Sequence, residues 1–529
     1  MSPTVTRAAA TAILLAGAVL RAIQYGARTS LSLDEVALVV NVIERDWTGL
    51  LFQPLAHAQV APAGFLFLEK ASVSVAGNAE LALRFFPFLM SLVSLVLFWR
   101  VSSRYLPSGV MLAALFVFAV SPTLILYAGV AKPYSGDIAM TLLLIGIALR
   151  LLKGPVTLPQ AAVLGTAGGV ALLLSYPAVL IGSGLGALLL VRGRRDGSLG
   201  PQLLVVLAGW SLGAAMATWA SLSTLSPDTA EYMQSFWKHG WVPPPWKGID
   251  EFLWIPSRLG TILTYSITGL HPPLRSLPEI ATVAFYALLV PLGFVYLFRS
   301  ERGTAGVLAI PVLVAIVAVV ARLLPLAGRV SFFLVPVLLI MCFAGPAQIR
   351  PWIPARMRDL AHATMLGLAI LPAVAGLARS FPPTAQGGTR AVLEEVKANW
   401  LPGDRLVVSR GTWTFRLVDY YGGLLGLEEW SPLDRLEGEY SAEEIMRSYL
   451  RRIDAYRGSP RVWFHLEGTT RCEDEAILRY LDAIGHRLHS VEAHLEWGHR
   501  ISAHLYDLSD PELLDRASAE TYPVPECRN

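Results

Sequence analysis

The sequence predicts a polytopic α-helical membrane protein with a small soluble α/β domain at its C-terminal end. Of the 529 residues, 54% are hydrophobic and only 16% are charged, whereas a soluble domain carries about 25% charged residues. Apolar runs of roughly 20 residues, the length that crosses a bilayer, recur up to residue 379 and then stop. We therefore expect a membrane domain over residues 1–380 and a soluble domain over residues 381–529.

About eleven apolar segments have the length and composition of transmembrane helices. The first lacks a small-residue cleavage site, so we expect a retained helix rather than a signal peptide. The segments are residues 8–25, 83–101, 107–127, 134–152, 158–174, 176–192, 201–222, 281–299, 303–322, 329–347 and 359–379.

Two further segments are predicted to be amphipathic helices on the membrane surface. Residues 62–77 are apolar but short, and they carry Glu69 and Lys70 near the middle. A charge at the centre of a spanning helix costs about 2.5–3.5 kcal/mol, and a helix lying in the interface avoids this cost. The stretch "LDEVALVVNVIERDW", residues 33–47, has apolar residues at close to helical spacing.

The basic residues predict the orientation. If the N-terminus is cytoplasmic and residues 62–77 do not span, the short loops on one face are all basic, as is typical of cytoplasmic loops. These loops contain Arg100, Arg104, Arg150, Lys153, Arg192, Arg194, Arg195, Arg299, Arg302, Arg350, Arg356 and Arg358. The opposite face then holds residues 26–82, 128–137, 223–280 and 324–329. We expect a multi-pass protein of the plasma or inner membrane, with these segments and the C-terminal domain extracytoplasmic.

The C-terminal region alternates predicted helices and strands, which indicates a small α/β domain. Helical patterns are "TRAVLEEVKANW", "SAEEIMRSYLRRIDAY", which opens with the capping-box pair Ser441 and Glu444, and "DEAILRYLDAIG". Strand patterns are "LPGDRLVVS", the buried "RVWFHLEG" and "ISAHLYDLS", an edge or final strand. Cys472 and Cys527 either pair, if the domain is extracytoplasmic, or are free thiols. Cys342 lies in an apolar run, where a thiol is ordinary packing.

Asp34 and Glu35 stand side by side at the predicted start of the first surface helix. One explanation is structural, because carboxylates at a helix N-terminus are stabilised by the helix dipole. The other is chemical, because a carboxylate beside a membrane can act as a general base toward a hydroxyl.

Basic and polar residues also gather at two predicted outer helix ends. Lys132, Tyr134 and Asp137 lie in "VAKPYSGD", and Arg329 lies in "LPLAGRVSFFLVP". Lys and Tyr are common interface anchors, and Arg can snorkel toward the headgroups. The alternative is that Lys132, Tyr134 and Arg329 bind a phosphate while Asp137 orients a sugar hydroxyl or Lys132. Arg329 heads its helix, where the dipole favours an anionic partner.

Two weaker candidates complete the set. Arg84, in "ALRFFPF", resembles Arg329 in its placement, and His57 precedes the second surface helix. A lone His is more often structural than a ligand, and no second His or Cys stands at metal spacing nearby. The sequence has no phosphate-binding glycine loop, no dinucleotide fingerprint, no zinc-type Cys pair and no hydrolase Ser motif. We expect no metal site, no cofactor and no nucleic-acid partner.

These residues resemble the GT-C glycosyltransferases, nearest the protein-mannosyltransferase-like group that includes the lipid A aminoarabinose transferases. The similar stretches are "LDE", the helix ending "DW", "HAQVAPAGFLFLEKASVSVAG", "ELALRFFPFLMSLVSLVLFW", "SPTLILYAGVAKPYSGD" and "LPLAGRVSFFLVP". The resemblance covers roughly residues 1–380 and is strongest over residues 20–140. It implies a GT-C fold, a polyprenyl-phosphate sugar as donor, and transfer to a hydroxyl of a lipid, glycan or protein.

The resemblance also implies roles for individual residues. The acidic residue of the first outer loop is the catalytic base in that family, which places the role on Asp34 with Glu35 beside it. The phosphate-binding positions correspond to Lys132 and Arg329. The aminoarabinose transferases have a Lys before the proline at residue 62, where this chain has Ala61. Ala63 also replaces a second proline common in the group, so the acceptor is not carried over.

Two other functional classes fit parts of the sequence. A transporter or flippase for a lipid or solute would explain the spans, but transporters place their polar sites near the bilayer midplane. Here the polar residues lie at one predicted face. A catalytically silent scaffold for envelope assembly would explain the soluble domain. Release of sugar from a polyprenyl-phosphate donor distinguishes the three classes.

Overall fold

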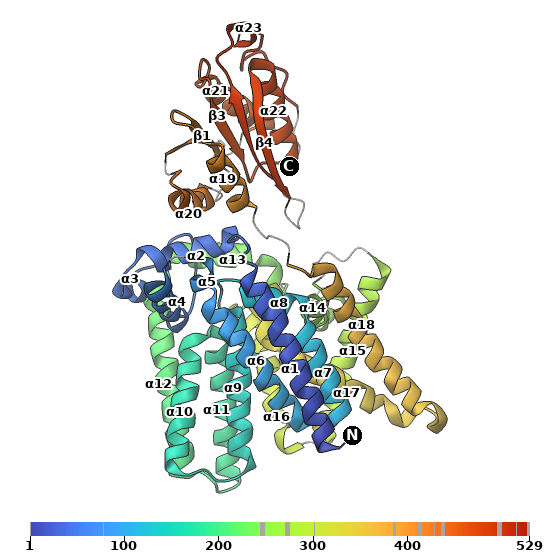
Figure 1. Ribbon diagram of the computed structural model, residues 1–529. Helices are drawn as coiled ribbons and strands as arrows, with labels where there is room; N and C mark the ends of the chain where they lie inside the picture. The colour runs from blue at the N-terminus through green and yellow to red at the C-terminus, as the bar shows by residue number, and fades with distance from the viewer. Residues whose placement is uncertain are drawn as a thin grey trace. The chain divides into compact units, whose positions relative to one another are not determined.

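The computed structural model divides the chain into two compact units (Figure 1). The membrane unit comprises residues 1–28 and 41–383, and the C-terminal unit comprises residues 29–40 and 384–529. Residues 29–40 therefore group with the C-terminal region, and within that unit the Leu31 N–H donates to the Tyr421 hydroxyl at 2.6 Å. The described residues are 2–77, 79–243, 249–269, 276–300, 302–383, 388–410, 415–427, 429–434, 440–494, 500–514 and 516–525.

The chain up to residue 383 is helical. Its helices are α1 (Pro3–Gly26), α2 (Leu33–Glu44), α3 (Trp47–Phe52), α4 (Ala63–Ala76), α5 (Glu80–Leu83), α6 (Phe85–Tyr105), α7 (Ser108–Val120), α8 (Pro122–Leu126), η1 (Tyr127–Gly129), α9 (Tyr134–Lys153), α10 (Leu158–Leu174), α11 (Tyr176–Arg195), α12 (Pro201–Thr224), α13 (Pro227–Phe236), η2 (Lys238–Gly240), α14 (Ile249–Thr268), α15 (Leu277–Ser300), α16 (Arg302–Val320), η3 (Gly328–Leu334), α17 (Val335–Ile349), η4 (Arg350–Trp352), η5 (Ala355–Met357) and α18 (Arg358–Ser380).

The predicted class of a polytopic helical membrane protein is confirmed. Within the described residues, nine helices are long and apolar enough to cross a membrane. The predicted span 107–127 is broken instead into α7 and α8, whose axes bend by 51°, and α10 has only 17 residues. Each of the eleven predicted segments is therefore helical, with two of them broken or short. The amphipathic segments are also helices, α2 and α4.

The segment 223–280 contains helices that the sequence analysis did not predict. α13 and α14 lie there, and α14 is a 20-residue helix. Its sequence mixes charged residues with apolar ones and contains Pro256, so it does not stand out as an apolar run. The turn stretch "WVPPPW" extends beyond the described residues, which stop at Pro243 and resume at residue 249.

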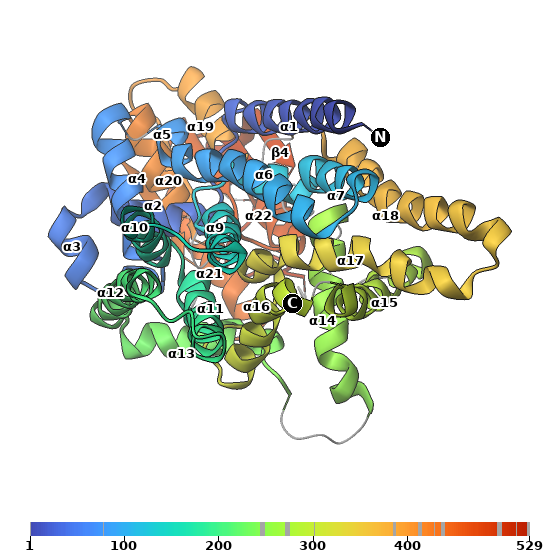
Figure 2. The same cartoon turned by 90° about the horizontal axis from the view of Figure 1, so that it is seen from below.

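Small residues allow the apolar helices to pack closely. α10 and α12 lie side by side (Figures 1 and 2), and each carries two glycines four residues apart, Gly165 and Gly169 on α10 and Gly209 and Gly213 on α12. A Cβ on Gly213 would lie 2.4 Å from the Gly169 carbonyl oxygen. Close backbone contact replaces the hydrophobic effect, which is weak between helices in lipid. Larger side chains at these glycines would separate the two helices.

Contacts between loops match the predicted division into two faces. On the predicted cytoplasmic side, Arg192 donates to the carbonyls of Arg302 and Gly303, and the Tyr105 hydroxyl donates to the Thr304 carbonyl at 2.9 Å. On the other side, three contacts join predicted outer segments, namely Ser223 with Leu51, Leu326 with Gly240 and Lys132 with Gln59. Each of these contacts therefore joins segments that were predicted to lie on the same face.

The C-terminal unit contains a five-stranded mixed sheet. Its elements are α19 (Thr389–Ala398), β1 (Arg405–Arg410), α20 (Phe415–Leu425), β2 (Trp430–Asp434), α21 (Ala442–Asp454), β3 (Val462–Leu466), α22 (Arg471–Ile484), β4 (His486–His494), β5 (Arg500–Asp507) and α23 (Pro511–Leu514). The strand order is β2-β1-β3-β5-β4, with β1 parallel to β2 and β3, and β5 antiparallel to β3 and β4. The predicted α/β domain is thus confirmed.

The core of the C-terminal unit lies between the sheet and two helices. Apolar residues of α21 and α22 pack on β3 residues, including Phe464, and on Tyr506 of β5. Ser441 and Glu444 form the predicted capping box at the start of α21. The strand at residues 501–509 is final in sequence, but the alternative of an edge strand is wrong, because β5 lies between β3 and β4. Cys472 is disulfide-bonded, and Cys527 lies outside the described residues.

Candidate functional site

The turn that precedes α9 collects the candidate cationic residues of the membrane unit. Its residues 130–133 connect η1 to α9, and Lys132 and Tyr134 flank Pro133 at the first turn of the helix. Pro133 cannot continue an α-helix from the preceding residues, so the chain turns here before α9 begins. The Lys132 N–H donates to the Val130 carbonyl at 2.8 Å, which tightens the turn.

Lys132 is buried and bonded to the loop between α1 and α6. Its side chain is 5% exposed, and its Nζ donates to Gln59 Oε1 at 2.7 Å. The Gln59 amide in turn donates to the His57 carbonyl at 3.2 Å. His57 has a backbone φ of 70°, a left-handed conformation that non-glycine residues seldom adopt. Two predicted site residues, Lys132 and His57, are thus brought together through Gln59, which bonds to the His57 backbone carbonyl.

Arg329 approaches the same turn from η3. Its Nε donates to the Tyr134 hydroxyl at 3.1 Å, and its guanidinium lies 5.9 Å from the Tyr134 ring centroid. The guanidinium also lies 5.8 Å from the Trp237 ring, within the distance at which a cation interacts with an aromatic face. Arg329 is half-buried, so part of its side chain is reachable. Arg329, 197 positions from Lys132 in sequence, therefore contacts the residue that begins α9, two positions after Lys132.

An aromatic cluster packs around Tyr134 at the end of this turn. Tyr127 of η1, Tyr134 and Phe332 of η3 contact one another with ring centroids 5.0–6.4 Å apart. Tyr265 of α14 packs on Phe332 at 5.7 Å and hydrogen-bonds with the Tyr127 hydroxyl. Four separate segments thus fix the positions of Tyr134 and the Arg329 backbone. A rigid arrangement of this kind is what a binding site for a defined group requires.

Asp137 lies one turn into α9 and is 5% exposed. The Ser175 hydroxyl hydrogen-bonds to its carboxyl group, and Ser175 also caps α11 by accepting from the Ala178 N–H at 3.2 Å. The observed role of Asp137 is therefore to join α9 to the start of α11. The predicted contact with a sugar hydroxyl or with Lys132 stays a prediction.

Asp34 and Glu35 lie in the first turn of α2, as the sequence predicted. Glu35 is 2% exposed, and its Oε2 accepts from the Ser32 N–H at 2.8 Å and from the Ser32 hydroxyl at 3.0 Å. This is a capping-box arrangement. Asp34 is half-buried beside it. Both residues belong to the segment 29–40 of the C-terminal unit, and a site that joins them to Lys132 and Arg329 is a prediction.

Arg84 ends α5 and is 2% exposed. Its backbone N–H donates to the Glu80 carbonyl at 3.1 Å. Its side chain is therefore enclosed by protein rather than directed to the surface, and a role in substrate binding stays a prediction.

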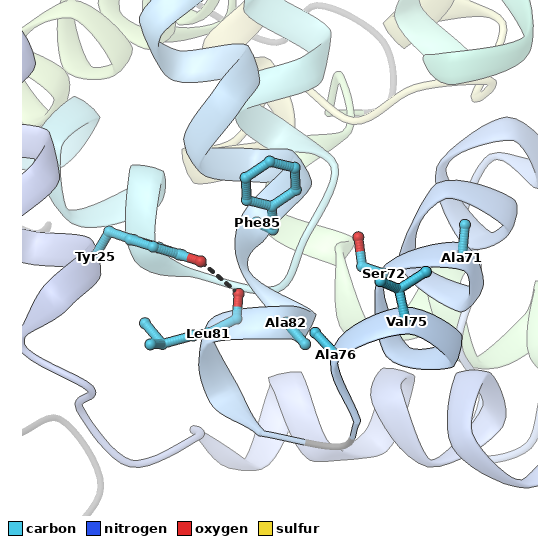
Figure 3. A pocket seen from close by; sticks show the side chains of 8 residues that line it. All are labelled: Tyr25, Ala71, Ser72, Val75, Ala76, Leu81, Ala82 and Phe85. Atoms are coloured by element: carbon cyan, nitrogen blue, oxygen red, sulfur yellow. Dashed lines mark hydrogen bonds between the residues drawn. The ribbon is translucent and has the colours of Figure 1, made fainter.

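A pocket of about 460 Å³ opens beside these elements, between α1, α4, α5 and the start of α6 (Figure 3). Tyr25, Val75, Leu81 and Phe85 are among the residues that line it, and the lining is mostly apolar. The Tyr25 hydroxyl is not available to a ligand as a free donor, because it donates to the Leu81 carbonyl at 2.7 Å. The pocket suits a hydrocarbon chain better than a sugar or phosphate, and it does not contain the cations at the α9 turn.

Several residues that build the site were not predicted from the sequence. Gln59 lies in "HAQVAPAGFLFLEKASVSVAG", one of the stretches that resemble the GT-C enzymes, so its polar side chain could have been predicted to belong to the site. Trp237, Tyr265 and Phe332 carried no signal, because nothing in their local sequence shows that they meet Arg329 and Tyr134. Within the described residues, no group of three or more His, Cys, Asp or Glu side chains could hold a metal ion.

The fold of the chain can be compared with the folds of known proteins. The chain has the fold of the GT-C membrane glycosyltransferases, as its sequence motifs suggested. No protein-family model matches the chain, and no curated protein matches its sequence.

Among solved structures, the chain is similar to ArnT from Cupriavidus metallidurans bound to undecaprenyl phosphate. The TM-score is 0.52 at 12% identity, over 97% of this chain and 99% of ArnT. The likeness thus extends beyond residues 1–380 to the C-terminal unit, and at this identity it concerns the fold alone.

Two further solved structures are similar to the chain with lower TM-scores. They are ArnT from Cupriavidus metallidurans in the apo state, with 13% identity, coverage of 96% and 99% and TM-score 0.48, and the Archaeoglobus fulgidus oligosaccharyltransferase in the apo form, with 12% identity, coverage of 95% and 75% and TM-score 0.47.

Proposed function

We propose that this protein is an integral membrane glycosyltransferase that moves a sugar from a polyprenyl-phosphate donor to a hydroxyl of a lipid, glycan or protein. The observation that carries the proposal is that Lys132 lies in the turn before α9 while Arg329 is bonded to Tyr134 at the end of the same turn. Buried or half-buried cations at the end of membrane helices favour an anionic partner. In a chain with this fold, the phosphate of a lipid-linked sugar is such a partner.

In the proposed reaction, the Asp34 carboxylate removes the proton from the acceptor hydroxyl. The acceptor oxygen forms a bond to the anomeric carbon of the sugar, on the face opposite the phosphate. The bond between the anomeric carbon and the phosphate oxygen breaks, and polyprenyl phosphate leaves with the electron pair. Attack from the opposite face inverts the anomeric configuration.

Lys132 and Arg329 stabilise the phosphate as its negative charge grows, which is the usual role of preorganised cations in catalysis. Gln59 and Tyr134 hold the two cations in place before the donor binds. The apolar pocket lined by Tyr25, Val75 and Phe85 accommodates part of a lipid hydrocarbon chain. Two protein cations suffice for one monophosphate, so the reaction is expected to need no metal.

The site is proposed to face the extracytoplasmic side. Loops that contact one another at the opposite end of the helices carry the basic residues Arg104, Arg192 and Arg302, which are typical of the cytoplasmic face. The disulfide bond of Cys472 also favours an oxidising compartment for the C-terminal unit.

The test is transfer of labelled sugar from a polyprenyl-phosphate donor by the purified protein in lipid nanodiscs or vesicles. We expect label to leave the donor, free polyprenyl phosphate to accumulate and the label to appear on an acceptor from an envelope extract. If the labelled donor instead crosses vesicle membranes intact, the protein is a flippase. If the donor neither reacts nor moves, the glycosyltransferase proposal is wrong.

A further inference from the structure

The third spanning segment of the chain is broken at Pro122, close to the proposed site. α7 ends at Val120, α8 begins at Pro122, and the two axes differ by 51°. Proline has no N–H, so the carbonyl of Phe118, four residues earlier, loses its helical donor. In an apolar membrane interior an unsatisfied carbonyl is unfavourable, and a neighbouring helix must supply the missing donor.

Arg21 of α1 supplies these donors. Its side chain is 1% exposed, and its two terminal nitrogens donate to the carbonyls of Phe118 at 3.2 Å and Ala119 at 2.8 Å. A third bond, to the Gly17 carbonyl at 3.1 Å, fixes the guanidinium to its own helix. A planar guanidinium can reach two adjacent carbonyls at once, which an ammonium cannot do with the same geometry. Arg21 thus caps the open end of α7.

Beyond the break, α8 is attached to α14. The Ser121 hydroxyl donates to the Ser266 carbonyl, and the Thr123 hydroxyl donates to the Tyr265 carbonyl at 2.8 Å. Tyr265 belongs to the aromatic cluster under the α9 turn. The start of the short segment from Ser121 to Gly129 is therefore held by two side-chain bonds to backbone carbonyls of α14.

The segment from Ser121 to Gly129 leads directly into the turn before α9, which contains Lys132. The Ser135 hydroxyl in the first turn of α9 donates to the Tyr127 carbonyl at 2.9 Å, and the Tyr127 ring contacts Tyr134. Gly129 packs against Gln24 of α1 so closely that a Cβ on Gly129 would lie 3.2 Å from the Gln24 side chain. Only two residues lie between Gly129 and Lys132. Movement of α8 and η1 would therefore displace both Lys132 and Tyr134.

We infer that Arg21 is a positioning residue, which caps the break between α7 and α8 and thereby fixes the turn that carries Lys132 and Tyr134. The capping of α7 by Arg21 follows from the hydrogen bonds to the Phe118 and Ala119 carbonyls. Its consequence for donor binding rests on the proposed function.

The first experiment measures hydrogen exchange of segment 121–135 in the full-length protein in detergent. Arg21→Met should accelerate exchange there by about tenfold, because two buried carbonyls lose their donors. Arg21→Lys should give a smaller change, since it keeps the charge but reaches fewer carbonyls. Arg7→Met is the matched control, because Arg7 lies on the same helix and is exposed, and it should leave exchange unchanged.

A rescue experiment separates capping from a general loss of stability. Pro122→Ala restores an N–H that can donate to Phe118, so adding it to Arg21→Met should return exchange of segment 121–135 toward the wild-type rate. The two substitutions should then be non-additive. Equal exchange in Arg21→Met and Arg7→Met would overturn the inference, and so would strict additivity of Arg21→Met and Pro122→Ala.

The second readout is binding of undecaprenyl phosphate, used as the probe. Arg21→Met should weaken binding by about fivefold to tenfold, and Pro122→Ala should partly restore it. If exchange responds as expected but wild-type protein does not bind the probe, the donor assignment fails and the cap stands. If the probe binds equally well to wild type and Arg21→Met, the positioning role is overturned.

Discussion

The first turn of α2 and the turn before α9 are both polar, but their contacts differ in kind. In α2, Glu35 bonds to Ser32, only three residues away. Before α9, Lys132 bonds to Gln59, and Tyr134 bonds to Arg329. The first arrangement follows from local helix chemistry, whereas the second exists only because distant segments converge. The comparison predicts that loss of the Glu35 cap lowers the local stability of α2, and that loss of Lys132 or Arg329 weakens binding of the proposed donor.

The comparison also distinguishes the two acidic neighbours. Glu35 is buried, and its carboxylate caps the helix by accepting a hydrogen bond from the Ser32 N–H. Asp34 is half-buried at the next position, and a base must be reachable by its substrate. This difference supports the choice of Asp34 as the proposed base and gives Glu35 the task of holding the helix that carries it.

The largest expected effect is that of Asp34→Asn. Loss of a general base should lower the turnover number by about 10²–10⁴-fold with little change in donor affinity, because the amide keeps the shape of the side chain. Asp46→Asn is the matched control. Asp46 caps α3 in the same loop by accepting from the Gly49 N–H at 2.6 Å, and Asn caps equally well. Turnover within threefold of wild type in Asp34→Asn, roughly the noise of such assays, would remove Asp34 from the mechanism.

The second largest effect is expected for substitutions of Lys132 and Arg329. Lys132→Ala and Arg329→Ala should each weaken binding of a polyprenyl phosphate by about 10–100-fold, since each removes a charged hydrogen-bond partner of the phosphate. Titration of the lipid phosphate against purified protein measures this. Arg322→Ala is the control, because Arg322 lies in the same loop and is exposed. Unchanged affinity in both cation variants would move the phosphate site elsewhere.

A pH effect on stability is expected in the C-terminal unit. Burial, with a smaller contribution from the Arg487 charge, lowers the pKa of the His504 imidazole to about 4. An unfolded His titrates near 6.5, so the unfolded state binds the proton first. The stability that neutral His504 contributes is therefore complete above pH 6.5 and decreases by about 3 kcal/mol as the pH falls to 4.

The measurement is hydrogen exchange of β4 and β5 in the full-length protein between pH 7 and pH 4, corrected for the intrinsic effect of pH. His504→Gln should remove this share of the acid sensitivity and keep a partner for Ser490, whose hydroxyl lies 2.9 Å from His504 Nδ1. Burial raises the pKa of Asp474 to about 6, which opposes the effect in wild type and variant alike. Identical pH profiles for the two proteins would contradict the prediction.

The smallest effect is expected for Glu35→Ala. Loss of the capping box should reduce the local stability of α2 by about 1 kcal/mol, seen as faster exchange of residues 33–44. Turnover per folded molecule should change by only a few-fold, about the factor that 1 kcal/mol represents. A loss of turnover as large as that in Asp34→Asn, with α2 still protected, would show that Glu35 is the base instead.

Much of the fold could be predicted from the sequence, because the signals are local. A span is recognised from about 20 consecutive apolar residues, and all eleven predicted segments are helical. The capping box at Ser441 depends on a spacing of three residues and is present. The interior position of β5 in the sheet could not be predicted in this way, because the strand order depends on the path of the chain between strands that are distant in sequence.

The candidate site shows the same division between local and distant information. The sequence by itself determined which residues carry charge beside the membrane, including Asp34, Lys132 and Arg329, and that Asp34 and Glu35 begin a helix. Only the tertiary structure decided that Gln59 binds Lys132, that Trp237 and Tyr134 hold Arg329, and that Arg21 caps α7. Hydropathy and helix capping act over a few residues, whereas these contacts depend on the packing of helices that lie far apart in the chain.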